Sequence, residues 1–349
     1  MDAADPTRDA NPTTRPGRAP VTQPQAHPTA PERSPFDLVA PELARMEAML
    51  AAQMQSDIGS IPAVGQHLLL AGGKRLRPLL AVLAARATDA PIEIGLAVGC
   101  AAEMIHTATL YHDDVVDDGR VRRGRPAARL VFGNGIVVLV GDFCLARALG
   151  TVADTGSLPV VQSLAATVKE MAEGEVAQLE RAGNPDATLA NYYDVIDRKT
   201  ASLIAWAARV GGAVPPGLEA PLSRFGRAVG RAFQIADDIL DCAVAENVAG
   251  KSVGHDLQEG KLTLPVLLAC EAAPSIRELI RRDMTENGMS AEAAAAIVAE
   301  VNRVGGVVAA KAEARAMIDA AIADLELLAP SPFRDALRDI AILSVERVS

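Results

Sequence analysis

The stretch IEIGLAVGCAAEMIHTATLYHDDVVDD, residues 92–118, joins a long apolar segment to four acidic residues. Apolar side chains occupy most faces between Leu96 and Val116, so the stretch predicts a buried helix. Asp113 and Asp117 are one turn apart on one face, separated by about 6 Å along the axis. Like charges at that spacing are destabilising, and they lie at the helix end that is already partly negative. Taken alone, the motif indicates either a bound cation or a solvated acidic helix end.

The same DDxxD spacing recurs at residues 237–241, and Asp237 follows Asp113 by 124 residues. This second motif also follows an apolar helix, Ala228 to Ala236. Two such motifs on otherwise buried helices predict helices that face each other across a cavity. Carboxylates without His or Cys select hard cations, Mg²⁺ above all, and protein-bound Mg²⁺ usually bridges to substrate phosphates. We therefore expect a di- or triphosphate ligand between the two motifs.

Groups of basic residues accompany both motifs. The segment GGKRLRP, residues 72–78, places three cations beside a flexible turn, and Lys199 lies in a separate RKTA segment. Further cations follow the motifs directly: Arg120, Arg122, Arg123 and Arg125 after the first, Lys251 and Lys261 after the second. Arg binds phosphate oxygens bidentately and Lys acts as a point charge, so the grouping predicts diphosphate clamps. The GxxxxGK[ST] spacing is absent from the glycine turn, which argues against an NTPase.

The composition favours helices over strands. Half of the 349 residues are hydrophobic but only 3% are aromatic, and Ala, Leu, Val and Glu dominate. The sequence predicts an all-α fold, a single-domain bundle of about ten or more helices around a central cavity. One helix is expected around Met46, and another begins near Pro78. Further helices are expected near residues 92–118, 137–150, 159–182, 189–211, 218–246, 261–271, 291–302, 306–328 and 332–347.

Residues 1–35 have a different character. They contain eight of the 22 prolines and almost no large apolar side chains. Such a segment cannot offset the entropy lost on ordering, so we expect a disordered Pro-rich tail and a folded domain over residues 36–349. The tail lacks the apolar core of a secretory signal, and its acidic residues and prolines favour a dispensable tail over an organellar transit peptide.

Charge and cysteine usage exclude several classes of protein. The formal net charge of -10 disfavours non-specific binding of nucleic acid. No uninterrupted apolar stretch reaches the roughly 18–20 residues of a membrane helix. The four cysteines, at positions 100, 144, 242 and 270, form no CxxC pair. We expect them to be buried thiols in a reducing compartment, and we expect the protein to be cytoplasmic.

These motifs, in this order, resemble those of the trans-prenyl diphosphate synthases, also called polyprenyl synthetases. The resemblance covers about residues 37 to 349 and lies in GGKRLRP (72–78), EMIHTATLYHDDVVDDGRVRRGRPA (103–127), GD (141–142), EGE (173–175), KTASL (199–203), FQIADDILD (233–241) and GKSVGHDLQEGKLTLP (250–265). It implies an all-α bundle around a deep cavity that normally works as a homodimer. It also implies a Mg²⁺-dependent condensation of isopentenyl diphosphate with an allylic diphosphate, farnesyl or geranyl.

The resemblance also assigns roles to individual residues. It implies an isopentenyl diphosphate site formed by Lys74, Arg77, His106 and Arg123. It implies an allylic diphosphate site formed by Arg122, Lys199, Thr200, Gln234, Lys251 and Lys261. Two or three Mg²⁺ ions would be held by Asp113, Asp117 and Asp237, with Asp114, Asp238 and Asp241 close by. Asp113, Asp114, Asp117, Arg122, Lys199, Asp237 and Lys251 would form the catalytic set.

The helix before Asp113 is the expected wall of the product tunnel. Short-chain members of the family often carry aromatic residues four or five positions before the first Asp, where this chain has Thr109 and Ala108. Both are small, with Ile105 and Met104 one turn deeper, so we expect an all-trans product of roughly C40–C50 of the kind used as quinone side chains. Release of such a product implies transient membrane contact.

Three other functions would fit parts of this sequence. A shorter-chain, geranylgeranyl-producing synthase is the first alternative. A terpene cyclase is less favoured, because cyclases steer carbocations with aromatic pockets and this chain has few rings. A noncatalytic subunit of a heteromeric synthase should have lost its acidic motifs, whereas both are intact here.

Overall fold

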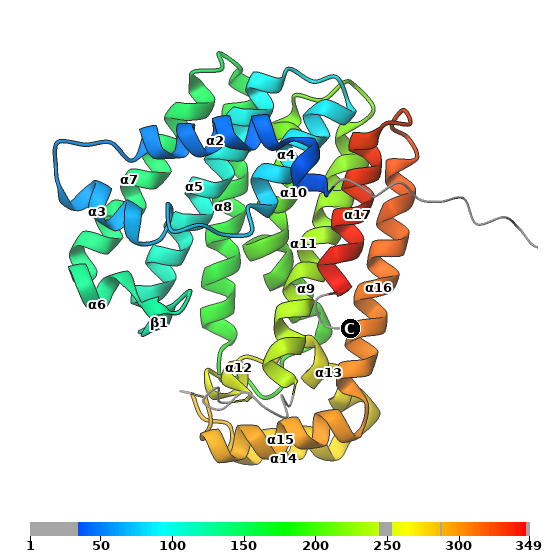
Figure 1. Ribbon diagram of the computed structural model, residues 1–349. Helices are drawn as coiled ribbons and strands as arrows, with labels where there is room; N and C mark the ends of the chain where they lie inside the picture. Colours follow the sequence, from blue (N-terminus) through cyan, green and yellow to red (C-terminus); the bar gives the residue numbers. More distant parts are fainter. Residues whose placement is uncertain (1–33, 244–252, 287, 347–349) are drawn as a thin grey trace, which may run out of the picture. The chain divides into compact units, whose positions relative to one another are not determined.

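Helix α5, Ile92–Val116, runs through the centre of a helical bundle, with α4, Leu76–Ala87, and α7, Asn134–Ala153, packed against it (Figure 1). The computed structural model describes residues 34–243, 253–286 and 288–346. Helices dominate these residues, so the predicted all-α fold is confirmed. From Leu96 to Ile105 every residue of α5 is buried, as its apolar sequence predicts.

The other elements complete the bundle in chain order. They are α1 Pro35–Leu38, α2 Ala40–Gln53, α3 Ser60–His67, β1 Val121–Arg122, β2 Arg125–Pro126, α6 Ala128–Phe132, α8 Leu158–Arg181, α9 Leu189–Ile196, the π-helix η1 Asp197–Ala201, α10 Ser202–Ala208, the 3₁₀ turn η2 Val210–Gly212, α11 Glu219–Cys242, α12 His255–Gln258, α13 Leu264–Ala272, α14 Pro274–Asp283, α15 Ala291–Arg303, α16 Gly306–Leu325 and α17 Pro332–Glu346. The strands β1 and β2 form an antiparallel hairpin, with Arg122 opposite Arg125.

Two glycines let the elements that carry the site approach closely. A Cβ on Gly230 of α11 would lie 2.6 Å from the Ala201 Cα, and one on Gly174 of α8 would lie 2.6 Å from the Lys199 backbone nitrogen. Only glycine fits at such distances. The π-helix η1 is therefore held tightly between α8 and α11, and this brings Lys199 and Thr200 beside the second acidic motif.

The predicted helices agree with the structure in type, and most ends differ by a few residues. The expected helix at 189–211 is instead divided into α9, η1 and α10, since the π-turn inserts an extra residue into the ladder. The short β1–β2 hairpin and the helices α6 and α14 were not foreseen. The four cysteines are free and buried, as expected. The predicted tail over residues 1–35 lies almost entirely outside the described residues.

Among the described residues, two helices, α5 and α7, are long and apolar enough to cross a membrane by length and composition, and the bent pair α15–α16 would be a third. The prediction that no uninterrupted apolar stretch has this length still holds, because polar residues such as Glu103 and Asp142 interrupt both helices; the helices qualify on their mean hydropathy. The most apolar window of α5 is 78% buried inside the structure, whereas that of α7 is 39% buried. The exposed residues of α7 include the large apolar side chains of Ile136, Leu139 and Leu149.

Candidate active site

A cavity of about 470 Å³ lies between α5, α7, α8, η1 and α11. Polar groups lining it include Arg77, His106, His112, Asp113, Arg122, Glu175, Lys199, Thr200, Gln234 and Asp237. Apolar groups lining it include Ile105, Ala108, Leu110, Leu145, Val168, Met171 and Phe233. One cavity therefore brings together both acidic motifs, cations from several elements and an apolar compartment.

Asp113 is the acidic residue of the first motif that lines this cavity. Burial raises the pKa of its carboxyl to about 6, with Lys199 opposing the shift and the negative charge of Glu175 adding to it. The Lys199 Nζ lies 4.0 Å from the Asp113 Oδ2 and 2.5 Å from the Glu175 Oε2. The motif thus presents a poorly compensated carboxylate that a further cation would stabilise.

The other acidic residues of the first motif differ from Asp113. Asp114 is buried away from the cavity, and its Oδ1 accepts hydrogen bonds from the Arg122 Nε at 2.9 Å and Nη2 at 2.7 Å. Asp114 thus holds Arg122, which lines the cavity, and its place in the catalytic set stays a prediction. Asp117 is exposed and caps the end of α5, where its N–H donates to the Asp113 carbonyl at 2.8 Å.

The three carboxylates of the second motif also have different surroundings. Asp237 lines the large cavity. Asp238 is buried and accepts hydrogen bonds from the Tyr192 hydroxyl at 2.6 Å and the Gln234 Nε2 at 2.9 Å. Asp241 instead accepts the backbone N–H groups of His255 at 3.0 Å and Asp256 at 3.1 Å. It therefore caps α12 and links the end of α11 to the segment that carries Lys261.

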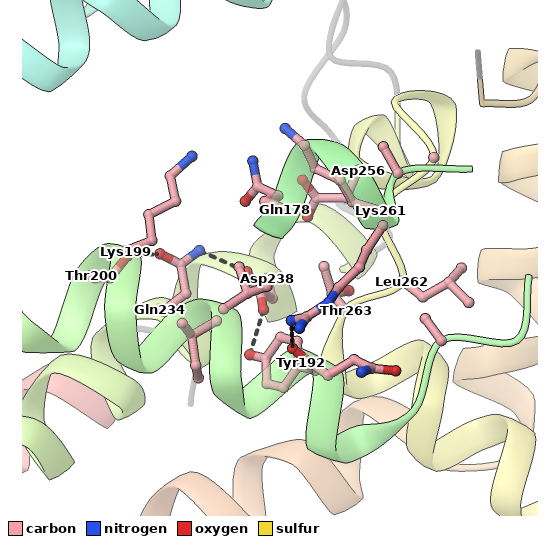
Figure 2. Close-up of a pocket in the computed structure, with 17 residues that line it drawn as sticks. Gln178, Tyr192, Lys199, Thr200, Gln234, Asp238, Asp256, Lys261, Leu262 and Thr263 are labelled. Atoms are coloured by element: carbon pink, nitrogen blue, oxygen red, sulfur yellow. Dashed lines mark hydrogen bonds between the residues drawn. The ribbon is translucent and has the colours of Figure 1, made fainter. Parts of the chain in front are cut away.

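A second cavity of about 190 Å³ adjoins the first and shares Lys199, Thr200 and Gln234 with it (Figure 2). Its other polar lining includes Tyr192, Asp238, Asp256 and Lys261. Burial raises the pKa of Asp238 to about 6, against the hydrogen bonds from Tyr192 and Gln234. Burial, and next the Asp238 charge, raise the pKa of Tyr192 far above its usual value, so its hydroxyl stays a donor.

The residues expected at the isopentenyl diphosphate site are partly assembled. Arg77 and His106 line the large cavity, and the Arg77 Nε is buried with no partner among the described residues. Burial, followed by the charges of Arg77 and Arg123, lowers the pKa of His106 well below its usual value, so the imidazole is neutral. The Lys74 Nζ lies 5.4 Å from the centre of the Phe233 ring, which faces the same cavity.

Arg123 is placed differently from the expectation. Its Nη1 donates to the carbonyl oxygens of Leu68, at 3.2 Å, and Gly72. It does not line either cavity, and its hydrogen bonds hold the turn before Lys74; its part in the isopentenyl diphosphate site stays a prediction. Lys251, which was expected to contact the allylic diphosphate, lies outside the described residues. Sequence reasoning had also assigned no role to Glu175, Phe233 or Tyr192, although Phe233 is one turn before Asp237 on the same helix.

The expected tunnel floor is part of the large cavity. Ala108, Thr109 and Ile105 line it, and no aromatic residue of α5 does. Met104 is buried but does not reach the cavity. Tyr111 points elsewhere, because its hydroxyl donates to the Val64 carbonyl at 2.8 Å. The wall of the cavity beside α5 is completed by Leu145 of α7 and Met171 of α8.

Within the described ranges, no three His, Cys, Asp or Glu side chains stand close enough together to hold a metal ion by themselves. The donors that face the cavity from α5 and α11 are carboxylates, the ligands that Mg²⁺ prefers. An ion held by one or two carboxylates needs further oxygens, which a diphosphate supplies. The unpartnered Arg77 nitrogen and the neighbouring cations suit the anionic ligand that such an ion requires. The residues present therefore fit Mg²⁺ bound together with a diphosphate.

Comparison with known proteins identifies the family of this chain. The model of the polyprenyl synthetase family matches residues 60–301. The octaprenyl diphosphate synthase of Escherichia coli is 39% identical over 314 residues, which cover 89% of this chain and 97% of that protein. The all-trans-nonaprenyl-diphosphate synthase of Rhodobacter capsulatus is 36% identical over 315 residues, covering 89% and 96%. The chain belongs to the polyprenyl synthetase family.

Solved structures agree with this assignment. A polyprenyl synthase from Caulobacter crescentus, complexed with calcium and isoprenyl diphosphate, superposes with a TM-score of 0.84 at 37% identity and covers 90% of this chain and 97% of that one. A decaprenyl diphosphate synthase from Rhodobacter capsulatus has a TM-score of 0.84 at 38% identity, covering 90% and 98%. The predicted family and its isoprenoid-synthase fold are therefore confirmed.

Proposed function

We propose that this protein is a Mg²⁺-dependent prenyltransferase that extends an allylic diphosphate with isopentenyl diphosphate to a long all-trans product of roughly C40–C50. The observation that carries the proposal is the large cavity, which Asp113 and Asp237 enter from separate helices above an apolar compartment without aromatic side chains from α5. Long-chain synthases among the similar proteins support the product class.

The cations and carboxylates around the cavity divide into two binding sites. Lys199, Thr200, Gln234 and Lys261 form the allylic diphosphate site together with Arg122, which Asp114 orients. Arg77, His106 and Lys74 form the isopentenyl diphosphate site, with Arg123 holding the turn that carries Lys74. Lys251 is proposed for the allylic site on the sequence resemblance alone. Two or three Mg²⁺ ions would be held by Asp113, Asp117 and Asp237 and would neutralise the departing diphosphate.

The chemistry follows from this arrangement. The allylic C–O bond breaks and pyrophosphate leaves with the electron pair, while Lys199 and Arg122 stabilise its charge. The double bond of isopentenyl diphosphate then attacks the allylic cation and forms the new C–C bond. A proton leaves the adduct and passes to the released pyrophosphate. The neutral imidazole of His106 suits a hydrogen-bonding role beside Arg77, since it adds no charge there.

The assembly is proposed to be a homodimer, with the open face of α7 as the main contact. Ile136 and Leu139 on α7 are 41% and 68% exposed, and Leu130 and Val131 on the adjacent α6 are both 54% exposed. A continuous apolar surface of this kind favours burial against another protein surface. A second copy fits because the same face is then covered on both subunits by one symmetric contact.

The remaining proposals come from the sequence and the family. The catalytic domain comprises residues 36–349, and residues 1–35 form an accessory tail. The enzyme would act in the cytoplasm, supply side chains for quinones such as ubiquinone, and release its product through transient membrane contact. The apolar compartment supports a product that partitions into a bilayer.

Product analysis tests this function. The purified protein is incubated with farnesyl and isopentenyl diphosphates and Mg²⁺, and the dephosphorylated products are resolved by mass spectrometry. The proposal predicts a ladder of five-carbon steps that ends at roughly C40–C50. Termination at C20 would instead support the geranylgeranyl alternative, and a hydrocarbon released from farnesyl diphosphate alone would support a cyclase.

A further inference from the structure

The buried carboxylate of Asp238 is held from two sides. The Tyr192 hydroxyl donates to its Oδ2 at 2.6 Å, and the Gln234 Nε2 donates to its Oδ1 at 2.9 Å (Figure 2). Asp238 is only 4% exposed and Tyr192 only 8%. Because each oxygen has its own donor, the plane of the carboxylate is fixed. The Tyr192 donor comes from α9, whereas Asp238 and Gln234 both belong to α11.

The hydrogen bonds continue from Asp238 towards the large cavity. The Thr200 Oγ1 donates to the Gln234 Oε1 at 3.1 Å. The Gln234 amide therefore donates at one end and accepts at the other, which leaves it a single orientation. Thr200 and Gln234 line both cavities, and Asp237, next to Asp238 in the chain, lines the large one. A chain of three hydrogen bonds thus runs from Tyr192 to groups at the proposed allylic diphosphate site.

We propose that Tyr192 is a positioning residue for that site: its hydroxyl fixes Asp238, and through Gln234 it fixes Thr200. The inference rests on the proposed function. A phenol suits this place because it satisfies a buried carboxylate without adding a positive charge. A cation here would neutralise an acidic region that must attract Mg²⁺. Tyr192 lines the second cavity and not the large one that Asp113 and Asp237 share, so its role in this proposal is exerted through Asp238.

The neighbouring Tyr193 provides a matched control. Its hydroxyl also donates to a carboxylate, that of Glu313 on α16, and its ring packs edge-on against the Tyr192 ring at 5.3 Å. Tyr193 lines neither cavity. Replacing either tyrosine by phenylalanine removes one hydroxyl and one charge-assisted hydrogen bond, so the two variants differ chiefly in whether the bond leads to the site.

The test compares Tyr192→Phe with Tyr193→Phe in the full chain. Loss of a hydrogen bond to a charged group predicts that Tyr192→Phe lowers kcat/KM for the allylic diphosphate by about 10- to 100-fold. The KM for isopentenyl diphosphate should stay within about twofold, because that site is formed by other residues. Tyr193→Phe should leave both constants near the wild-type values.

A double-mutant cycle with Asp238→Asn distinguishes positioning from a general effect on packing. If Tyr192 acts through Asp238, adding Tyr192→Phe to Asp238→Asn causes little further loss. Calorimetric titration with inorganic pyrophosphate at fixed Mg²⁺ gives a readout without turnover, and Tyr192→Phe should weaken that binding by about 10-fold.

Two results would overturn the inference: additive losses in the cycle, or pyrophosphate affinity in Tyr192→Phe equal to that in Tyr193→Phe. The calorimetry also separates this inference from the proposed function. If the wild-type protein makes no polyprenyl product, the proposed function fails, while the pyrophosphate titration still reports whether Tyr192 organises an anion site.

Discussion

Replacing Ala108 with phenylalanine should shorten the product. Ala108 is fully buried and lines the large cavity, so the ring would enter the apolar compartment. Ala108 precedes Asp113 by five residues, about 7.5 Å along α5. Each five-carbon unit adds four chain bonds of about 1.5 Å, or about 5 Å when extended. Measured from Asp113, the ring would lie about one and a half units along this wall, so we expect farnesyl diphosphate to be extended by only a few units and the products to be far shorter than C40.

The size of the effect follows from the carbons that lose their binding site. A five-carbon unit that cannot enter the apolar compartment loses about 0.8 kcal/mol of binding free energy for each carbon that would have been buried, or about 4 kcal/mol in total. That corresponds to a loss of roughly 1,000-fold in the rate of the blocked elongation step. Some growing tails would bend past the ring, which would reduce this loss of rate. We therefore expect the amount of long product to fall by at least about 10-fold.

The assay is extension of farnesyl diphosphate with radiolabelled isopentenyl diphosphate, followed by separation of the products by chain length. Ala153→Phe, the same substitution at an exposed position at the end of α7, is the control and should leave the product length unchanged. An unchanged distribution in folded, active Ala108→Phe would refute the assignment of this wall to the product tunnel.

Four further predictions test other parts of the structure. Asp114→Asn should lower kcat at least about 10-fold, because Arg122 loses its charged partner; steady-state kinetics would show it, and wild-type rates would contradict it. Burial raises the pKa of Asp113 from 3.8 to about 6, so the metal-free fold loses stability as pH rises through that range. Asp113→Asn should consequently raise the Tm more at pH 7 than at pH 5, and an equal change at both would count against a buried charge. Asp241→Ala should cost about 1 kcal/mol and speed amide hydrogen exchange in α12, where unchanged protection would argue against the cap. Leu139→Glu should convert the proposed dimer to a folded monomer in light scattering, and a persistent dimer would place the interface elsewhere.

The sequence was enough to predict the fold class and the family. The helical spacing of apolar residues before each DDxxD motif predicted the long buried helices. The motifs quoted above occur in the same order as in the family, which predicted the family. The same reasoning predicted that Asp113 and Asp237 would meet, since two carboxylate motifs on buried helices need a shared cation. These predictions depend on the spacing of residues within one segment, which does not require knowledge of how distant elements pack.

Other features of the site depend on tertiary packing that no local pattern reveals. Asp114 and Asp113 are neighbours in sequence, yet one holds Arg122 and the other faces the cavity, because successive helix positions point about 100° apart. Asp241 matches the motif spacing but caps a helix that begins fourteen residues later in the chain. Tyr192 reaches Asp238 only because the fold brings this side chain of α9 to α11, 46 residues further along the chain. Such pairings between distant elements are set by the fold as a whole.

In the proposed mechanism, the two acidic motifs would hold one diphosphate between them through Mg²⁺. A crystal structure with Mg²⁺ and an unreactive thiodiphosphate analogue of farnesyl diphosphate tests it most directly. We expect ions bound to Asp113 from one side and to Asp237 from the other, with oxygens of the same diphosphate completing the coordination of both. It would be contradicted by ions on only one motif, or by a diphosphate bound outside the cavity that Asp113 and Asp237 share.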